Sequence, residues 1–562
     1  MFESMNLKVK KLSSLEKVFL HEEPLAACSL VDSVLRGEKY SYQIAYYIDP
    51  EEAEVAQYLH VKAVPSPGIN VKMSRVGVVP SEMPAYPKTD ADYLTKHPGL
   101  FPDPLLELTD DNIKVLPGQW RSIWVEAEFA EDAAVQDAAI IIRFLHEDGT
   151  KLAEVSHTIS LIDAVLPKQT LIHTGWFHYD CLSTHYGVEE LSESHWTLIE
   201  DYMRTAAEHG MNMILTPLFT PPLDTKIGGE RPTVQLVKVH VNAEGNYLFD
   251  FQRLKRFIDM ALRTGMEYFE MSHLFTQWGA VSAPKIIASI AGEERAIFGW
   301  DTDAGGDAYR KFLSSLLPQL TSVLEEWGIQ ERCYFHISDE PNLEQLDSYR
   351  RACEIMEPHL RGYKVIDALS DYEFYEKGLI QTPIPANDHI DAFIEAKVPN
   401  LWTYYCCAQH NKVSNRFMSM PSRRNRIIAT QLYKFDIAGF LHWGYNFWYT
   451  QFSIHAINPY AVTDAGCGFP SGDAFLVYPG AEGSPVTSIR LKVFREALYD
   501  LRAMNLLESL SSKEFVMSII EEAAVEPITF SEYPRKEQYI IDMRNRINRE
   551  IQERLVTATS IM

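Results

Sequence analysis

Two neighbouring carboxylates, Asp339 and Glu340, are the residues of this sequence best placed for acid–base chemistry. They follow the apolar run CYFHIS (333–338) and precede Pro341. Carboxylates in contact raise each other's cost of ionisation, so one of them can keep its proton near neutral pH and act as a general acid. The common alternative is structural, because an Asp that caps a helix is often followed by a Glu in the first turn. For an isolated pair the helix cap is the better interpretation, so the surrounding residues must decide.

Aromatic and polar side chains gather at the ends of three other predicted strands. Flat rings are suited to stack on the apolar faces of sugars. One such stripe is more often part of a core, but three stripes that converge beside two carboxylates indicate a sugar site. The candidate substrate-binding residues are His273, Gln277 and Trp278, then Trp402, Tyr404 and Tyr405, then Trp443, Tyr445, Asn446 and Trp448, and, in a later Gly/Pro-rich loop, Asp473 and Tyr478.

The elements that must position these residues alternate between strand and amphipathic helix from residue 169 onward. No GxGxxG or GxxxxGK[ST] motif follows any of the strands. Eight strand–helix units in this length fit a closed (β/α)8 TIM barrel, in which the active site lies at the carboxyl ends of the strands. The predicted strands are 171–177, 212–218, 267–274, 333–338, 363–367, 389–396, 401–407 and 439–445.

The sequence on either side of the barrel has a different character. Residues 1–165 carry short β-like runs separated by turns and predict an N-terminal β-sandwich, interrupted by a Pro-rich loop or linker over 64–104. The catalytic barrel is predicted over 166–500. Residues 501–562 read as a helical C-terminal region. The fold class is therefore α/β, with three parts.

Charge and composition exclude several classes of partner. A formal net charge of -25 and the lack of any Lys/Arg cluster disfavour nucleic acid and membrane surfaces. The chain shows neither a signal peptide nor a run of about 18 apolar residues, so a cytoplasmic location is predicted. The scattered cysteines and histidines lack metal-ligand spacing, so we expect no metal and no cofactor. A carbohydrate is the expected partner, and a homo-oligomer remains open.

The positions of the carboxylates also bear on mechanism. Glycoside cleavage ordinarily uses two carboxylates on opposite sides of the scissile bond, and neighbours in sequence cannot easily straddle a sugar. In the large barrel clan of retaining enzymes the fourth strand ends in Asn-Glu and the seventh in Glu, whereas here the fourth ends in Asp-Glu and the seventh, LWTYYCC, has no carboxylate. This pattern favours substrate assistance, in which the 2-acetamido oxygen of the substrate attacks the anomeric carbon.

At these residues the sequence resembles glycoside hydrolase family 123, the β-N-acetylgalactosaminidases, and related uncharacterised proteins with the same catalytic domain. The resemblance rests on Asp339-Glu340 and on the segments 272–280, 439–448, 472–480 and 489–500. It implies that Glu340 is the acid/base and that Asp339 holds the acetamido group. It also implies an acetamido-binding tyrosine, Tyr404 or Tyr405. Side-chain alternation along a strand lets only one of these two face the pocket.

The sequence thus predicts a retaining exo-β-N-acetylgalactosaminidase that hydrolyses terminal β-linked N-acetylhexosamine through an oxazolinium intermediate. A second hypothesis pairs Glu340 with a carboxylate from another strand end, such as Glu270 or Asp367, in a retaining or inverting β-glycosidase acting on a sugar without an acetamido group. A third is a carbohydrate-binding protein without catalysis. The galacto or gluco configuration depends on the polar group that meets the 4-hydroxyl, which the sequence leaves open.

Overall fold

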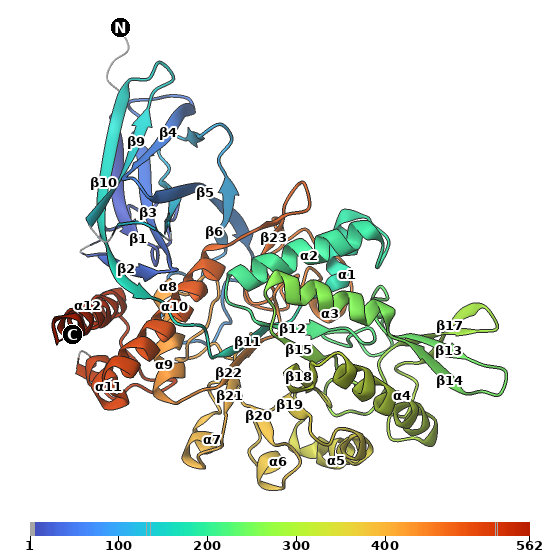
Figure 1. The fold of residues 1–562 in the computed structure, drawn as a ribbon. Coiled ribbons are helices and arrows are strands. Elements are labelled where there is room, and N and C mark those ends of the chain that lie inside the picture. Colours follow the sequence, from blue (N-terminus) through green and yellow to red (C-terminus); the bar gives the residue numbers. More distant parts are fainter. Residues whose placement is uncertain are drawn as a thin grey trace.

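The chain folds into an N-terminal pair of β-sheets, a parallel barrel and a helical C-terminal region (Figure 1). The structure is a computed structural model, and it describes residues 6–27, 29–130, 132–134, 137–522, 524 and 526–561. Among these residues no helix has both the length and the apolar character needed to cross a membrane. The described cysteines are all free, and Cys28 lies outside the described residues.

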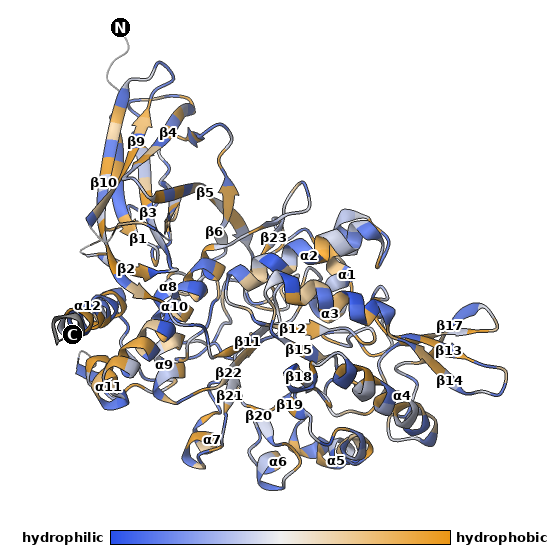
Figure 2. Ribbon diagram, in the orientation of Figure 1, coloured by the Kyte–Doolittle hydropathy of each residue, from blue (hydrophilic) through white to orange (hydrophobic). Residues whose placement is uncertain are grey.

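Two five-stranded sheets pack face to face in the N-terminal region and share a core of alternating apolar side chains. The alternation is visible along β10 in Figure 2, where hydrophobic and hydrophilic bands follow one another. One sheet has the order β1 (Leu7–Ser13), β3 (Lys39–Ile48), β8 (Arg121–Phe129), β5 (Ile69–Ser81) and β6 (Gly99–Glu107). The other has the order β2 (Ser33–Arg36), β10 (Lys151–Val165), β9 (Asp137–Leu145), β4 (Gln57–Pro65) and β7 (Asn112–Val115).

Eight parallel strands form the barrel in chain order. The first and last strands pair in parallel, and the ring closes where Ala386 bridges Tyr404. Seven of the eight predicted strands are confirmed, six within their predicted ranges and the fifth extending one residue beyond its range. The strands are β11 (Ile172–Gly175), β12 (Met213–Thr216), β15 (Tyr268–Met271), β18 (Cys333–Phe335), β19 (Lys364–Ala368), β20 (Thr382–Ile384), β21 (Trp402–Tyr404) and β22 (Gly439–His442).

The predicted sixth strand, 389–396, is wrong. That segment contains the short helix α7 (Asp391–Glu395), whose Phe393 and the preceding Ile390 are buried on one side. The true sixth strand is β20, which contains Pro383 and is followed by Pro385. Proline lacks the backbone N–H that a strand ladder needs, so a segment with two prolines does not show the sequence pattern of a strand.

The prediction of a loop or linker over 64–104 is correct only in its middle. Strands β5 and β6 occupy nearly half of the segment, and residues 82–98 form an ordered loop that is docked on the barrel. Asp90 and Asp92 of this loop pair with Arg424 and Arg423, and the Leu94 amide donates to the Ser419 carbonyl at 2.8 Å. This loop between β5 and β6 therefore covers part of the barrel.

Helices cover the outside of the barrel, and a small sheet extends from it on the side away from the N-terminal region (Figure 1). The sheet has the order β14 (Tyr247–Asp250), β13 (Lys238–Val241), β16 (Ile286–Ile290) and β17 (Glu293–Phe298). The helices are α1 (Tyr179–Tyr186), α2 (Glu193–Glu208), α3 (Gln252–Thr264), α4 (Asp307–Glu326), α5 (Leu346–Met356), α6 (Glu373–Glu376), α8 (Ser422–Arg426) and α9 (Ile428–Lys434).

The C-terminal part of the chain joins the barrel to the N-terminal sheets. It contains the short strands β23 (Tyr478–Pro479) and β24 (Pro485–Val486), and the helices α10 (Ile489–Leu510), α11 (Lys513–Glu522) and α12 (Glu537–Ile561). Buried ion pairs cross this junction. Arg544 of α12 binds Asp500 of α10 and Glu38 of the N-terminal region, and Arg490 of α10 binds Asp103 of β6 through two hydrogen bonds.

Candidate active site

A cavity of about 300 Å³ opens at the carboxyl ends of the barrel strands, and both Asp339 and Glu340 line it. This is the place where barrel enzymes build their sites. Its walls come from loops after at least six different strands, so the site depends on the closed barrel. The other lining residues are Trp176, Leu223, Asp224, Gln277, Trp278, Ala368, Tyr404, Cys406, Cys407, Leu441, Trp443, Gln451, Phe452 and Phe469.

Glu340 is held toward the cavity by an unusual backbone conformation. Its φ is 45°, in the left-handed region that non-glycine residues seldom adopt, and its amide donates to the Ala368 carbonyl at 2.9 Å. The hydroxyl of Tyr404 donates to Glu340 Oε1 at 2.6 Å. The side chain is exposed to the cavity, but protein atoms surround its carboxyl; this desolvation raises the pKa of Glu340, and the Tyr404 hydrogen bond opposes the rise.

The helix-cap interpretation of the pair is wrong. The side chain of Asn342 accepts from the Glu344 amide and caps the short 3-10 turn Leu343–Gln345, after which α5 begins. The Asp339 carbonyl accepts instead from the Trp278 amide at 2.9 Å. Neither carboxylate of the pair therefore caps a helix.

Asp339 is buried, and its carboxylate has no hydrogen-bond donor within the described part of the chain. Burial raises the pKa of Asp339 well above its ordinary value, and the neighbouring Glu340 charge raises it further. Nearby Asp367 and Glu270 act in the same direction, whereas protonated His336 opposes them. Asp339 lines the cavity, and its carboxylate oxygens are not among the atoms sealed from solvent without a partner. This carboxyl is therefore suited to receive a proton or an N–H group from a bound molecule.

Beneath the pair lies a fully buried group of three charged residues, Glu270, His336 and Asp367. The His336 ring donates from Nε2 to Glu270 and from Nδ1 to Asp367 at 3.0 Å. Burial alone would lower the pKa of His336, but these hydrogen bonds and charges raise it to about 10. The two carboxylates also accept from Trp176 Nε1 at 2.7 Å and from the Ile337 amide at 3.0 Å. Neither carboxylate lines the cavity.

Aromatic side chains form much of the cavity wall, as the sequence pattern predicts. Trp278 and Phe452 stand at the rim with ring centroids 6.1 Å apart, and each is 37% exposed. Trp443 is fixed from behind, because its Nε1 donates to Asp473 Oδ2 at 2.9 Å. Burial raises the pKa of Asp473 to about 7, and Asp473 lies behind Trp443 rather than in the wall.

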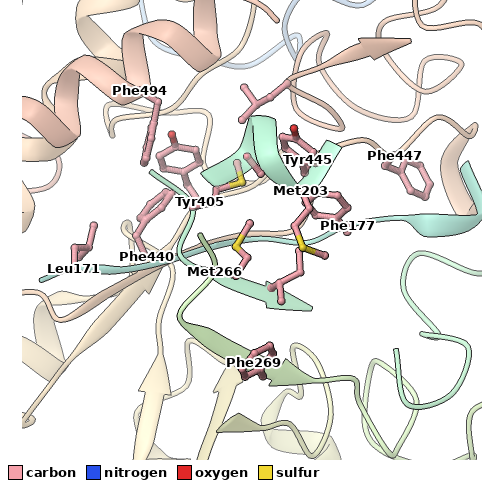
Figure 3. Close-up of a cluster of buried hydrophobic side chains, with 14 of the residues drawn as sticks. Leu171, Phe177, Met203, Met266, Phe269, Tyr405, Phe440, Tyr445, Phe447 and Phe494 are labelled. Atoms are coloured by element: carbon pink, nitrogen blue, oxygen red, sulfur yellow. The ribbon is translucent and has the colours of Figure 1, made fainter. Parts of the chain in front are cut away.

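Several predicted binding residues lie outside the cavity. Tyr405 and Tyr445 belong to the buried hydrophobic cluster between the strands and the outer helices, where Tyr405 lies near Phe440 (Figure 3). Tyr404 is thus the one of the two neighbouring tyrosines that faces the cavity. The Trp402 ring fills the barrel core against Gly439, where a Cβ atom would come within 2.1 Å of it.

The remaining predicted residues have structural contacts. The Asn446 side chain binds the backbone of His178 through both of its polar atoms. Trp448 donates to the Val477 carbonyl, and Tyr478 donates to Asp103 at the junction with the N-terminal sheets. His273 is buried and stacks on His336 with centroids 4.1 Å apart. Gln277, Trp278, Tyr404 and Trp443 are the predicted substrate-binding residues that line the cavity.

Sequence reasoning missed Trp176, Asp224 and Phe452. Trp176 is the next-to-last residue of the predicted first strand, so its aromatic ring near a strand end was a signal that could have found it. Asp224 and Phe452 stand in long loops after β12 and β22, with no motif or periodic pattern around them. Only the closure of the barrel brings these loops together, since the Phe452 amide donates to Asp224 Oδ2 at 2.9 Å.

One group of described residues, His273, His336 and Asp367, has ligand atoms close enough to hold a metal ion. Both nitrogens of His336 are already within hydrogen-bond distance of carboxylates. A doubly protonated imidazole has no lone pair for a metal. The geometry therefore fits an ion-pair network better than a metal centre.

A parallel eight-stranded barrel with a carboxylate pair and an aromatic cavity at its strand ends defines a carbohydrate-active barrel enzyme. Residues 176–507, more than half of the chain, match the family model described as the glycoside hydrolase 123 catalytic domain. The chain belongs to glycoside hydrolase family 123 and is a glycoside hydrolase. A solved family 123 glycoside hydrolase from Clostridium perfringens superposes with a TM-score of 0.75 at 15% identity, covering 99% of this chain and 100% of that one.

Other solved structures share less of the architecture. A family 2 glycosyl hydrolase from Bacteroides cellulosilyticus DSM 14838 has a TM-score of 0.24 at 10% identity and covers 77% of this chain and 45% of its own. An Ig-like-domain-containing family 10 xylanase from termite gut has a TM-score of 0.32 at 10% identity, with coverage of 84% and 99%. No curated protein matches the chain.

Proposed function

We propose that this protein is a retaining exo-β-N-acetylgalactosaminidase that removes terminal β-linked N-acetylhexosamine by substrate assistance. One observation carries the proposal: Asp339 and Glu340 line one cavity side by side, and Asp339 has no donor from the described chain while Tyr404 binds Glu340. An acceptor without a partner beside a protonatable acid suits an acetamido N–H and a glycosidic oxygen, respectively.

In the first step the acetamido carbonyl oxygen of the substrate attacks the anomeric carbon. The bond from that carbon to the glycosidic oxygen breaks, and Glu340 gives its proton to the leaving oxygen. Asp339 accepts the acetamido N–H and stabilises the positive charge of the oxazolinium ring. In the second step Glu340, now a carboxylate, takes a proton from water as the water oxygen attacks the same carbon and the ring opens. Two inversions at one carbon give overall retention.

The hypothesis that Glu340 works with Glu270 or Asp367 finds no support in the geometry. Both carboxylates are fully buried, hydrogen-bonded to His336 and outside the cavity. Neither can reach an anomeric carbon held beside Glu340 without breaking those bonds. The carbohydrate-binding hypothesis without catalysis is set aside, since the chain is a glycoside hydrolase.

The substrate class follows from the acetamido requirement and from the relative of known structure. The Clostridium perfringens protein is described in connection with glycolipid glycan hydrolysis. We propose glycans with a terminal β-linked N-acetylgalactosamine as substrates of this chain, with glycolipid glycans among them.

The test uses aryl β-N-acetylgalactosaminide, aryl β-N-acetylglucosaminide and simple aryl hexosides with wild type and Glu340→Gln. We expect turnover of an N-acetylated substrate and a loss of at least roughly 10²-fold in Glu340→Gln, largest for poor leaving groups that need protonation. Glu344→Gln, which changes an exposed carboxylate in the same loop, is the matched control and should keep wild-type activity.

Inhibition provides the second arm of this test. A thiazoline mimic of the oxazolinium ion should inhibit competitively, because the site is built for that ring. Higher activity on simple hexosides than on N-acetylated ones, or near-normal activity of Glu340→Gln, contradicts the proposal.

A further inference from the structure

Besides the carboxylate pair, the cavity wall contains two polar side chains, Asp224 and Gln277, that stand among apolar and aromatic neighbours. Asp224 belongs to the loop after β12, and Gln277 to the loop after β15. The mechanism above uses neither of them. Polar groups placed in an otherwise apolar cavity usually fix the orientation of a ligand.

Hydrogen bonds fix which end of the Gln277 amide is free. The Asp224 backbone amide donates to Gln277 Oε1 at 2.8 Å. The other end, Nε2, is buried and has no hydrogen-bond partner within the described residues. Leaving a buried N–H donor unpaired is unfavourable, so this amide is poised to bind an acceptor that the described part of the chain does not supply.

Asp224 offers the complementary acceptor. Its Oδ2 accepts from the Phe452 amide at 2.9 Å, and for Oδ1 the described chain provides no donor. Burial raises the pKa of this carboxyl to about 6, so it is mainly ionised at pH 7. Its backbone has a φ of 39° and its carbonyl accepts from Ser453 Oγ at 2.7 Å, so two loops hold the carboxylate in place.

We propose that Asp224 and Gln277 form a hydroxyl-binding subsite for the sugar held in the cavity. A sugar hydroxyl can accept from Gln277 Nε2 while it, or its neighbour on the ring, donates to Asp224 Oδ1. This assignment deepens the proposed function and rests on it for the identity of the sugar. The two residues act in positioning and specificity, and the acid–base steps stay with Asp339 and Glu340.

The proposal rests on a donor, Gln277 Nε2, and an acceptor, Asp224 Oδ1, that both lack a partner among the described residues. An apolar group in the same place would leave both polar atoms desolvated and unpaired, whereas a hydroxyl satisfies both at once. A site built to bind a hydroxyl discriminates strongly against the analogue that lacks it. The subsite would therefore help to select among sugars that differ in a single hydroxyl.

The experiment combines enzyme variants with substrate variants. Wild type, Asp224→Ala, Asp224→Asn and Gln277→Ala are assayed on the aryl hexoside that wild type cleaves best and on its 3-, 4- and 6-deoxy analogues. On the parent we expect kcat/KM to fall roughly 10- to 100-fold in Asp224→Ala, as for a hydrogen bond to a charged group. On one deoxy analogue the same substitution should cost less than about 3-fold, because the bound hydroxyl is already missing.

Matched variants separate recognition from loop anchoring. Asp224→Asn keeps an acceptor for the Phe452 amide but loses the charge. Its kcat/KM on the parent should therefore lie between the values of wild type and Asp224→Ala. Ser453→Ala removes an anchor of the same loop without changing a residue that lines the cavity. It should leave the discrimination between parent and deoxy substrates unchanged.

Three results overturn the subsite. One is an equal fall in the kcat/KM of Asp224→Ala on the parent and on every deoxy analogue, which indicates a structural role. Another is a change in the discrimination between parent and deoxy substrates in Ser453→Ala that is as large as the change in Asp224→Ala. The third is a fall in kcat of more than about 10⁴-fold on all substrates in Asp224→Ala, which indicates a catalytic carboxylate. A wild type that cleaves only hexosides without an acetamido group contradicts the proposed function instead, and the same series on that hexoside still decides the subsite.

Discussion

Two groups of acidic residues lie in successive layers of the same barrel and differ in how their charges are satisfied. In the lower layer, protonated His336 stands between Glu270 and Asp367, and each carboxylate accepts further hydrogen bonds. In the upper layer, Asp339 and Glu340 stand beside each other and form no ion pair with any described residue, and Tyr404 donates to Glu340.

The comparison teaches where to look for chemistry. A buried ion network whose members are all paired stabilises the fold around it, and removing one member leaves a charge without compensation. A pair of like-charged groups with an unpaired oxygen and a strained backbone contributes little stability and remains available to a ligand. The unpaired layer is the one that lines the cavity.

The largest expected effect tests the lower layer. His336→Gln removes the cation between two buried carboxylates and should lower the free energy of unfolding by about 3–5 kcal/mol. Glu340→Gln, in the upper layer, should stay within about 1 kcal/mol of wild type. Thermal and urea denaturation at pH 7 check both values.

The pH dependence sharpens this contrast. The pKa of His336 is raised to about 10 from an ordinary value near 6.5. A raised pKa contributes stability that is fully present below about pH 6.5 and is lost as pH rises through about 10. The stability gap between wild type and His336→Gln should therefore narrow between pH 7 and 10. A gap that is constant or widens contradicts the ion network.

The next largest effect tests the upper layer. Asp339→Asn removes the charge that stabilises the oxazolinium ion and should lower kcat by roughly 10²- to 10³-fold. In the ionised form of Asp339 that the oxazolinium step requires, the variant also removes a like charge beside Glu340, so the pKa of Glu340 should fall. The basic limb of the pH–rate profile, where the acid loses its proton, should then move to lower pH. A basic limb that stays in place in this variant would show that the two carboxyls do not interact.

The smallest effect separates two adjacent tyrosines. Tyr404→Phe removes the donor to Glu340 and should reduce kcat/KM by roughly 10-fold, the equivalent of about 1.4 kcal/mol. Loss of this donor raises the pKa of Glu340, so the basic limb should move to higher pH, opposite to Asp339→Asn.

Tyr405→Phe is the control for that measurement. Its hydroxyl makes a long 3.5 Å contact with Asn425 outside the cavity, so activity and pH profile should match wild type. Equal losses in the two tyrosine variants would contradict the assignment of Tyr404 to the cavity face.

The fold could be predicted from the sequence wherever the patterns were long and local. Seven strands and the helices between them show hydrophobic periodicity that does not depend on distant contacts. The sixth strand failed because it is short and carries Pro383, and its existence depends on pairing with β19. Strands β5 and β6 were hidden for the same reason, since prolines within and around them resemble a linker.

The site could be predicted in part. The Asp339-Glu340 pair could be recognised because its two residues are adjacent in the sequence. The aromatic residues at strand ends predicted Trp278, Tyr404 and Trp443. The same pattern also picked Tyr405 and Trp448, because a ring in a core and a ring in a wall look alike in sequence. Which face a side chain takes is decided by the register and twist of the barrel.

The sequence by itself determined the acidic pair, the barrel pattern and the absence of a carboxylate on the seventh strand, since each follows from residue type and local spacing. Only the tertiary structure decided that Asn342 makes the cap in place of Asp339, that His336 neutralises the layer below, and that Asp224 faces the cavity. These outcomes depend on contacts between loops far apart in the chain, whose positions are set by the closure of the barrel.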